Sequence, residues 1–120
     1  MKILGIDFGT KRIGLALYND KVDVILPFGK VSDLDELARL IKQEEIEKIV
    51  LGMPVGLSGG ENKNTSRVED FASQLEKKTK IKVEFFDERF SSQQADSMGG
   101  AVSRDEKSAM VILNSYLEKN

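Results

Sequence analysis

The feature that most constrains the fold is a pair of short apolar runs, residues 48–52 and 81–86, with one amphipathic stretch between them. Four apolar side chains of that stretch recur at the spacing of one helix face: Val68, Phe71, Ala72 and Leu75. A strand–helix–strand unit returns the chain in the same direction, so we expect the two runs to form parallel strands. The sequence therefore predicts an α/β fold.

Three further strands are expected before this unit, joined as an antiparallel meander. They are predicted over residues 2–8, 12–19 and 22–31. The dipeptides Gly9-Thr10 and Asn19-Asp20 supply turn chemistry between them. Together with the parallel pair, these strands predict a five-stranded mixed sheet.

Two more helices complete the pattern, one after the meander and one at the end of the chain. Ser32 and Asp35 form a capping-box pattern ahead of the first, which is expected to end near Glu45. Ser103 is the expected N-cap of the last helix, which presents an apolar stripe: Ala109, Ile112, Leu113 and Tyr116. The predicted order is βββαβαβα with the helices packed on the sheet, and the length fits one domain over residues 1–120.

The chain contains no cysteine and no histidine, which narrows its possible chemistry. Disulfides, thiol nucleophiles, imidazole bases and the usual nitrogen and sulfur ligands of zinc are excluded. Hydrolysis would come from carboxylates, hydroxyls or lysine, most commonly from carboxylates that hold Mg²⁺ or Mn²⁺. No apolar run reaches the roughly 18 residues that span a bilayer, and the N-terminus lacks a secretory-signal pattern, so we expect a cytoplasmic protein without membrane association.

Three acidic positions are candidates for a metal site: Asp7, the adjacent pair Asp87 and Glu88, and Asp105. Asp7 ends an apolar strand, where an ionised carboxylate is costly unless a partner such as a metal compensates it. The adjacent acids Asp87 and Glu88 follow another apolar strand, and Asp105 continues the apolar stripe of the last helix. Each also has a plainer interpretation, as a turn cap, a surface ion pair and a helix-dipole partner, respectively.

The acids together support a metal site more strongly than each does alone, because the predicted topology can bring them to one edge of the sheet. If one strand separates the first strand from the fifth, their backbones lie about 10 Å apart, and inward carboxylates can share one or two metal ions. Two-metal phosphodiester hydrolysis needs such a cluster and requires no histidine. Four nearby polar residues are candidates for phosphate contacts: Thr10, Arg12, Arg89 and Ser92.

Residues 5–16, Gly-Ile-Asp-Phe-Gly-Thr-Lys-Arg-Ile-Gly-Leu-Ala, closely resemble the opening motif of the YqgF family of bacterial proteins, also called RuvX. Three further segments resemble family motifs in the right order: residues 50–54 (Val-Leu-Gly-Met-Pro), 87–89 (Asp-Glu-Arg) and 105–117. The family is described as pre-16S rRNA nucleases or Holliday-junction resolvase homologues. The resemblance spans the whole chain.

The resemblance implies a ribonuclease H-like fold and metal-dependent nuclease chemistry, with Asp7, Glu88 and Asp105 as catalytic residues and ligands of one or two Mg²⁺ or Mn²⁺ ions. Asp87 is the reserve candidate for the position of Glu88. It implies a nucleic-acid partner, the 5′ end of pre-16S rRNA rather than branched DNA, and a role in ribosome biogenesis as a monomer or homodimer. Lys11, inside the opening motif, joins the candidates for substrate binding.

Two departures from the family pattern bear on substrate binding. Ser92 stands where threonine is more frequent, which keeps the hydroxyl. Residues 98–102, Met-Gly-Gly-Ala-Val, replace a longer and more basic connection before the last helix. The expected phosphate-binding surface is thinner as a result.

Other interpretations stay open. Residues 7–10, Asp-Phe-Gly-Thr, also resemble the phosphate-binding start of the actin, Hsp70 and sugar-kinase superfamily, whose second lobe one short domain cannot supply. The glycines of residues 52–60 do not make a P-loop, because no Gly-Lys-Ser/Thr follows; residues 55–65 are expected to form an exposed loop. A Holliday-junction resolvase and a non-catalytic RNA-binding or ribosome-assembly module are the remaining alternatives.

Overall fold

A computed structural model describes residues 1–8, 13–54, 63–88 and 104–119. Its strands form one sheet in the order β3-β2-β1-β4-β5. The strands are β1 (Lys2–Phe8), β2 (Ile13–Asn19), β3 (Val24–Val31), β4 (Lys48–Pro54) and β5 (Val83–Glu88). The helices are α1 (Leu34–Gln43), α2 (Lys63–Thr79) and α4 (Arg104–Lys119). Within this part of the chain, no helix is long and apolar enough to cross a membrane.

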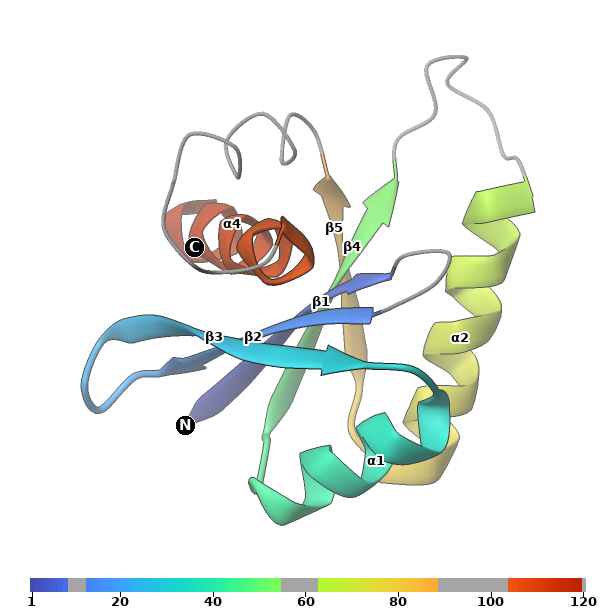
Figure 1. Ribbon diagram of the computed structural model, residues 1–120, viewed down its shortest axis with the longest axis horizontal. Coiled ribbons are helices and arrows are strands. Elements are labelled where there is room, and N and C mark those ends of the chain that lie inside the picture. Colours follow the sequence, from blue (N-terminus) through green and yellow to red (C-terminus); the bar gives the residue numbers. More distant parts are fainter. Residues whose placement is uncertain (9–12, 55–62, 89–103, 120) are drawn as a thin grey trace.

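The central strand, β1, runs antiparallel to β2 and parallel to β4 (Figure 1). β3 continues the meander beside β2, and β5 lies parallel to β4 at the other side of the sheet. The predicted element order and mixed sheet are confirmed, and one strand, β4, separates β1 from β5. β1, β4 and β5 are parallel, so their carboxyl ends lie along the same side of the sheet, which we call the carboxyl edge. The last residues of these strands are Phe8, Pro54 and Glu88.

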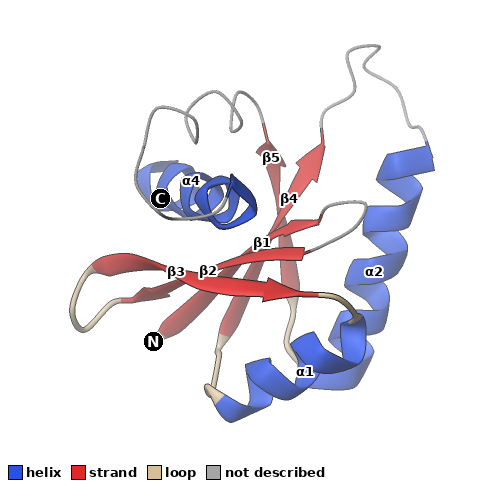
Figure 2. Cartoon of the chain, viewed as in Figure 1, coloured by secondary structure: helices blue, strands red, loops and turns tan. Residues whose placement is uncertain are grey.

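Helices cover both faces of the sheet: α1 and α2 lie on one face and α4 on the other (Figure 2). On the α1/α2 face, the core includes Leu4 and Ile6 of β1. On the α4 face, Ile3 of β1 and Val50 of β4 pack with Ile112 of α4. Side chains alternate along a strand, so odd-numbered positions of β1 and even-numbered positions of β4 belong to the α4 face.

α4 lies close to β1 because Gly5 has no side chain. A Cβ atom at position 5 would come within 2.5 Å of Cγ of Leu113 and 3.0 Å of the carbonyl oxygen of Ala109. Real Cβ atoms essentially never show the first distance, and the second is tighter than most real Cβ contacts, so the close approach of the helix favours glycine at this position. The apolar stripe predicted for the last helix is confirmed, since Ala109, Ile112 and Leu113 are buried against the sheet.

The N-cap of α1 is Asp33, and the predicted capping box starting at Ser32 is wrong by one residue. Asp33 has an extended backbone, with φ −146° and ψ 170°, and its carboxylate accepts the backbone N–H of Glu36 at 2.8 Å. Aspartate is as good a cap as serine, so neighbouring residues of both types leave the starting position undetermined by sequence.

Two other predicted boundaries also differ from the structure, since β5 covers residues 83–88 rather than 81–86 and α2 begins earlier than expected. β5 continues through Asp87 and Glu88, so these acids belong to the end of the strand rather than to a following loop. α2 begins at Lys63, inside the stretch expected to be a loop; residues 55–62 of that stretch lie outside the described residues.

Candidate metal centre

Asp7 lies at the carboxyl edge, one residue before the end of β1, and is partly buried. Its neighbours Ile6 and Phe8 belong to the α1/α2 core, and the ring of Phe8 contacts that of Phe71 on α2 with centroids 4.6 Å apart. Alternation therefore places Asp7 on the α4 face. Its pairing partner on β2 is Gly14, which is buried and adds no side chain beside the Asp7 carboxylate.

The same alternation distinguishes the two acids at the end of β5. Tyr116 of α4 donates a hydrogen bond from its hydroxyl to the carboxylate of Glu84, and its ring meets that of Phe86 edge-on, with centroids 6.3 Å apart. Positions 84 and 86 therefore belong to the α4 face. Position 88 has the same parity and position 87 the opposite one, so the backbone assigns Glu88, and not Asp87, to the face that carries Asp7.

Strand register fixes the level of these positions along the sheet. Ile6 pairs with Leu51 and Leu51 pairs with Phe85, so Asp7 lies one residue beyond this row and Glu88 three residues beyond it. Two strand spacings and two residues of offset correspond to roughly 12 Å between the two backbone positions. The sheet thus brings Asp7 and Glu88 to the same edge and the same face.

Asp105 is the second residue of α4, one helical turn before Ala109, whose carbonyl oxygen lies over Gly5. Residues four apart share a helix face, so position 105 continues the face that meets the sheet. The next residue, Glu106, accepts the backbone N–H of Gly29 at 2.8 Å, which attaches the first turn of α4 to β3. The start of α4 is therefore fixed over the β3 side of the sheet.

The other end of α4 is fixed by three polar residues that the sequence did not identify as a cluster: Glu84, Tyr116 and Lys48. Besides Tyr116, the carboxylate of Glu84 meets the ammonium of Lys48 at 3.4 Å, and that ammonium lies 5.2 Å from the centroid of the Tyr116 ring. The hydrogen bond from Tyr116, and secondarily Lys48, lowers the pKa of Glu84. Burial and the Glu84 carboxylate raise the pKa of Tyr116. α4 consequently crosses the sheet from β3 to β5.

Asp7 is the one proposed ligand whose side chain the structure describes; for Glu88 and Asp105 only the backbone is described. Among the described side chains, no three acids converge as a metal site. The substrate-binding candidates lie outside the described residues: Thr10, Lys11, Arg12, Arg89 and Ser92. So does the shortened connection over residues 98–102.

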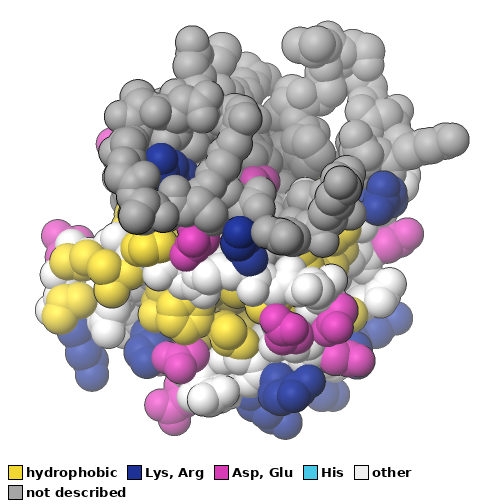
Figure 3. Space-filling model, in the orientation of Figure 1, with side chains coloured by type: hydrophobic (Ala, Val, Ile, Leu, Met, Phe, Trp, Pro, Cys, Tyr) yellow, Lys and Arg dark blue, Asp and Glu magenta, His cyan; other side chains and the backbone are white. Residues whose placement is uncertain are grey.

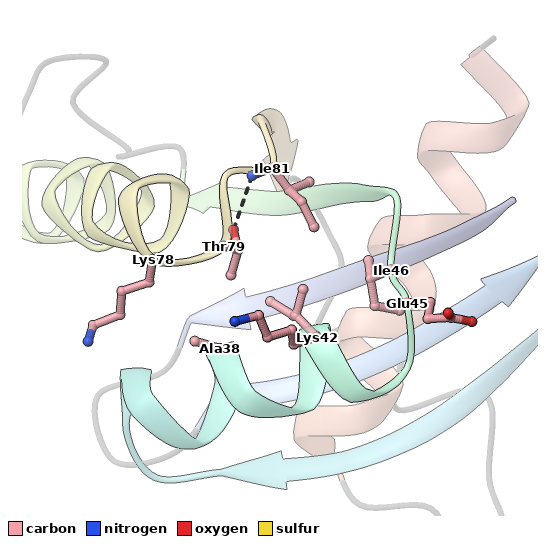
Figure 4. A pocket seen from close by; sticks show the side chains of 8 residues that line it. Ala38, Lys42, Glu45, Ile46, Lys78, Thr79 and Ile81 are labelled. Carbon is pink, nitrogen blue, oxygen red and sulfur yellow. Dashed lines mark hydrogen bonds between the residues drawn. The ribbon is translucent and has the colours of Figure 1, made fainter.

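A small cavity of about 210 Å³ lies between the ends of α1 and α2 (Figure 4). Its lining includes Lys42, Glu45, Thr79 and Ile81, and the hydroxyl of Thr79 accepts the backbone N–H of Ile81. These residues precede β4 and β5, so the cavity lies at the amino ends of the parallel strands, opposite the carboxyl edge. It contributes nothing to the candidate metal centre.

These strands and helices define a ribonuclease H-like fold. The structure entitled "T. thermophilus RuvC in complex with Holliday junction substrate" superimposes with a TM-score of 0.66 over 93% of this chain and 90% of that chain, at 10% identity. A structure described as "a putative sugar kinase from Cytophaga hutchinsonii" superimposes with a TM-score of 0.52 at 16% identity, over 80% of this chain but 39% of that one. The likeness to sugar kinases is thus confined to part of their length.

The chain belongs to the RuvX family. The family model, described as "RuvX: Holliday junction resolvase", matches residues 1–119. A relative from Koribacter versatilis, named "Putative pre-16S rRNA nuclease", is 37% identical over 98% of this chain and 87% of its own. That alignment runs over 135 positions, although this chain has 120 residues, so the relative carries residues that this chain lacks.

Proposed function

We propose that this protein is a metal-dependent nuclease that hydrolyses phosphodiester bonds, with the 5′ end of pre-16S rRNA as its substrate. The observation that carries the proposal is the placement of Asp7 and Glu88 on one face of one sheet edge, with the start of α4 over the same face. The substrate follows the name of the Koribacter versatilis relative. We further propose that residues 1–120 act as one domain, in the cytoplasm.

The donor set suits Mg²⁺ or Mn²⁺, because hard divalent cations prefer oxygen ligands and this chain has no histidine or cysteine. Asp7, Glu88 and Asp105 would hold one or two ions. Asp87 is set aside, since its strand position belongs to the opposite face. When bound, the metal would lower the pKa of a coordinated water and stabilise charge on the leaving oxygen.

The protein's own residues would orient the nucleic acid around that centre. Gly14, the residue paired with Asp7, adds no side chain of its own beside the carboxylate that a phosphodiester would approach. We propose phosphate contacts from the residues that flank the acids in sequence: Thr10, Lys11, Arg12, Arg89 and Ser92. Such contacts fix the register of the chain being cut without reading its bases.

The first experiment compares cleavage of a pre-16S rRNA 5′-end fragment with that of a four-way DNA junction, with Mg²⁺ or Mn²⁺ and with EDTA. We expect metal-dependent cleavage of the rRNA fragment by the wild type and none by Asp7→Asn. Cleavage that survives EDTA, or equal activity in the two proteins, contradicts the proposal.

Two alternatives predict different outcomes in the same assay. The family description favours branched DNA, and paired cuts in a junction would then require a two-fold dimer, whereas an rRNA end does not. Junction cleavage by a homodimer supports this alternative. RNA binding that Asp7→Asn leaves unchanged, without cleavage by either protein, supports a non-catalytic ribosome-assembly module.

A further inference from the structure

We propose that Lys30 of β3 binds a backbone phosphate of the nucleic acid and extends the substrate-binding surface from the carboxyl edge of β1 across β2. The inference rests on the proposed function, and it adds a residue that lies far in sequence from the acidic motifs. The ligand class is a phosphodiester, whether in RNA or in DNA.

A β-bulge in β3 places Lys30 on the α4 face. Ala16 pairs with Pro27, but Gly14, two residues earlier, pairs with Lys30, so β3 holds one extra residue in this interval. Gly29 lies in the interval with φ +88°, a conformation that favours glycine. Because the bulge shifts the alternation, Val31 returns to the α1/α2 core and its neighbour Lys30 belongs to the opposite face.

Glu106 stabilises this arrangement from α4. Its carboxylate accepts the N–H of Gly29 across 77 residues of sequence, so the bulge is attached to the turn of α4 that contains Asp105. Bulges commonly redirect a side chain next to a functional site. Lys30 is next in sequence to Gly29, the donor of this hydrogen bond, and the proposed metal ligand Asp105 is next to Glu106, its acceptor.

Register places Lys30 in line with the catalytic edge. Asp7 pairs with Gly14 and Gly14 pairs with Lys30, so the three residues form one row across β1, β2 and β3. Two strand spacings put the backbones of Asp7 and Lys30 about 10 Å apart. Gly14, between them, is buried and carries no side chain, so Asp7, which is partly buried, and Lys30, which is exposed, are the side chains of this row that a nucleic-acid strand can contact.

The charge of Lys30 is available for such a contact. The residue is exposed, and it has no ion pair within the part of the chain that the structure describes. Among the described residues on the molecular face drawn in Figure 3, acidic and basic side chains are interspersed and form no broad basic field. With a net charge of −2, individually placed cations carry more of the phosphate binding.

The test measures the salt dependence of binding. A fluorescein-labelled pre-16S rRNA 5′-end fragment and a labelled four-way junction are titrated with protein in Ca²⁺, at several KCl concentrations, with gel analysis of ligand integrity. The proteins are the wild type, Lys30→Gln, Lys30→Arg and the control Lys21→Gln. Lys21 is exposed in the turn between β2 and β3, beyond the pairing of Asn19 with Lys2 at the opposite end of β1.

We expect Lys30→Gln to reduce the slope of log Kd against log salt by about 0.7 to 0.9 and to weaken binding about fivefold at 0.1 M salt. Lys30→Arg should restore both values, and Lys21→Gln should change neither. An unchanged slope in Lys30→Gln, equal losses in Lys21→Gln, or no binding of either ligand by the wild type overturns the inference. If Lys30→Gln reduces the slope but the wild type cleaves neither ligand with Mg²⁺ or Mn²⁺, the Lys30 contact is supported and the proposed nuclease activity is contradicted.

Discussion

The carboxylate of Glu106 accepts the backbone N–H of Gly29 at 2.8 Å, which joins the first turn of α4 to the edge strand β3. At the other end of the helix, the hydroxyl of Tyr116 donates to Glu84 of β5. Between these contacts, α4 approaches β1 closely over Gly5. The position of the start of α4 relative to Asp7 therefore depends on three contacts that can be removed one at a time.

Replacing Glu106 with alanine should lower the free energy of unfolding by about 1.5 to 3 kcal/mol, since hydrogen bonds to charged groups contribute that much. Glu106→Gln keeps an acceptor oxygen and should lose less. Urea denaturation measures the stability, and hydrogen exchange at the Gly29 amide reports the bond itself. Equal exchange rates at Gly29 in wild type and Glu106→Ala would show that the contact does not persist in solution.

Gly5→Ala should destabilise the protein by about 1 to 3 kcal/mol, because the added methyl group has no room beneath Leu113 and the Ala109 carbonyl. The thermal unfolding midpoint measures this cost. The double variant Gly5→Ala/Leu113→Ala removes the clash with the Leu113 side chain but not the contact with the Ala109 carbonyl, so its loss should be smaller than the sum of the two single losses. Additive losses would mean that α4 does not lie as close to β1 as the structure places it.

The Tyr116–Glu84 contact should make stability depend on pH in the acidic range. The pKa of Glu84 is lowered in the folded protein, first by the Tyr116 hydrogen bond and then by Lys48, below its ordinary value of 4.5. A lowered folded-state pKa gives stability that is present above the unfolded pKa and is lost as pH falls through the folded one. Tyr116→Phe should therefore reduce the urea midpoint more at pH 7 than at pH 3.

Tyr18→Phe is the matched control for that measurement. The hydroxyl of Tyr18 donates to Asp23 at 2.7 Å on the exposed hairpin, where solvent screens the interaction. Its removal should change the midpoint little at either pH. If the pH dependence of the Tyr116→Phe effect equals that of Tyr18→Phe, Glu84 is not the group responsible.

The sheet was predictable from sequence because its signals are local. Period-two strands, the apolar runs over residues 48–52 and 81–86 and the helix between them are visible in short windows, and the rule for crossovers supplied the parallel pair. The confirmed order also meets the condition that one strand separates β1 from β5. This condition made a shared site for Asp7 and Glu88 geometrically possible.

The parts that sequence did not predict depend on contacts between distant segments. The hydrogen bond from Gly29 to Glu106 joins positions 77 residues apart, so no local sequence pattern indicates it. Lys30 was not among the candidate residues. Simple alternation from Pro27 would assign Lys30 to the α1/α2 face, and the bulge places it on the α4 face instead. Gly29, a glycine inside the strand pattern, was a sequence signal for a bulge. No sequence signal identified Glu106 as the residue that accepts its N–H.

Assigning position 88, rather than position 87, to the α4 face also required the structure. Adjacent acids in sequence are equivalent candidates until strand parity is known, and parity is known only when neighbours on that strand are seen to contact a helix. Tyr116 provides that reference through Glu84 and Phe86. The family resemblance supplied the same choice from motif position, and the two arguments are independent.

The most direct test of the central claim, that Asp7 and Glu88 form one metal centre on the α4 face, is Mn²⁺-dependent cleavage of the pre-16S rRNA fragment by Glu88→Gln and Asp87→Asn. Each variant removes one negative charge from neighbouring positions of β5. We predict that Glu88→Gln, like Asp7→Asn, loses about a hundredfold or more in rate, since even residues that only support metal ligands cost up to about a hundredfold. Asp87→Asn should retain activity within a few-fold of wild type. Full activity in Glu88→Gln, or a larger loss in Asp87→Asn, would contradict the account.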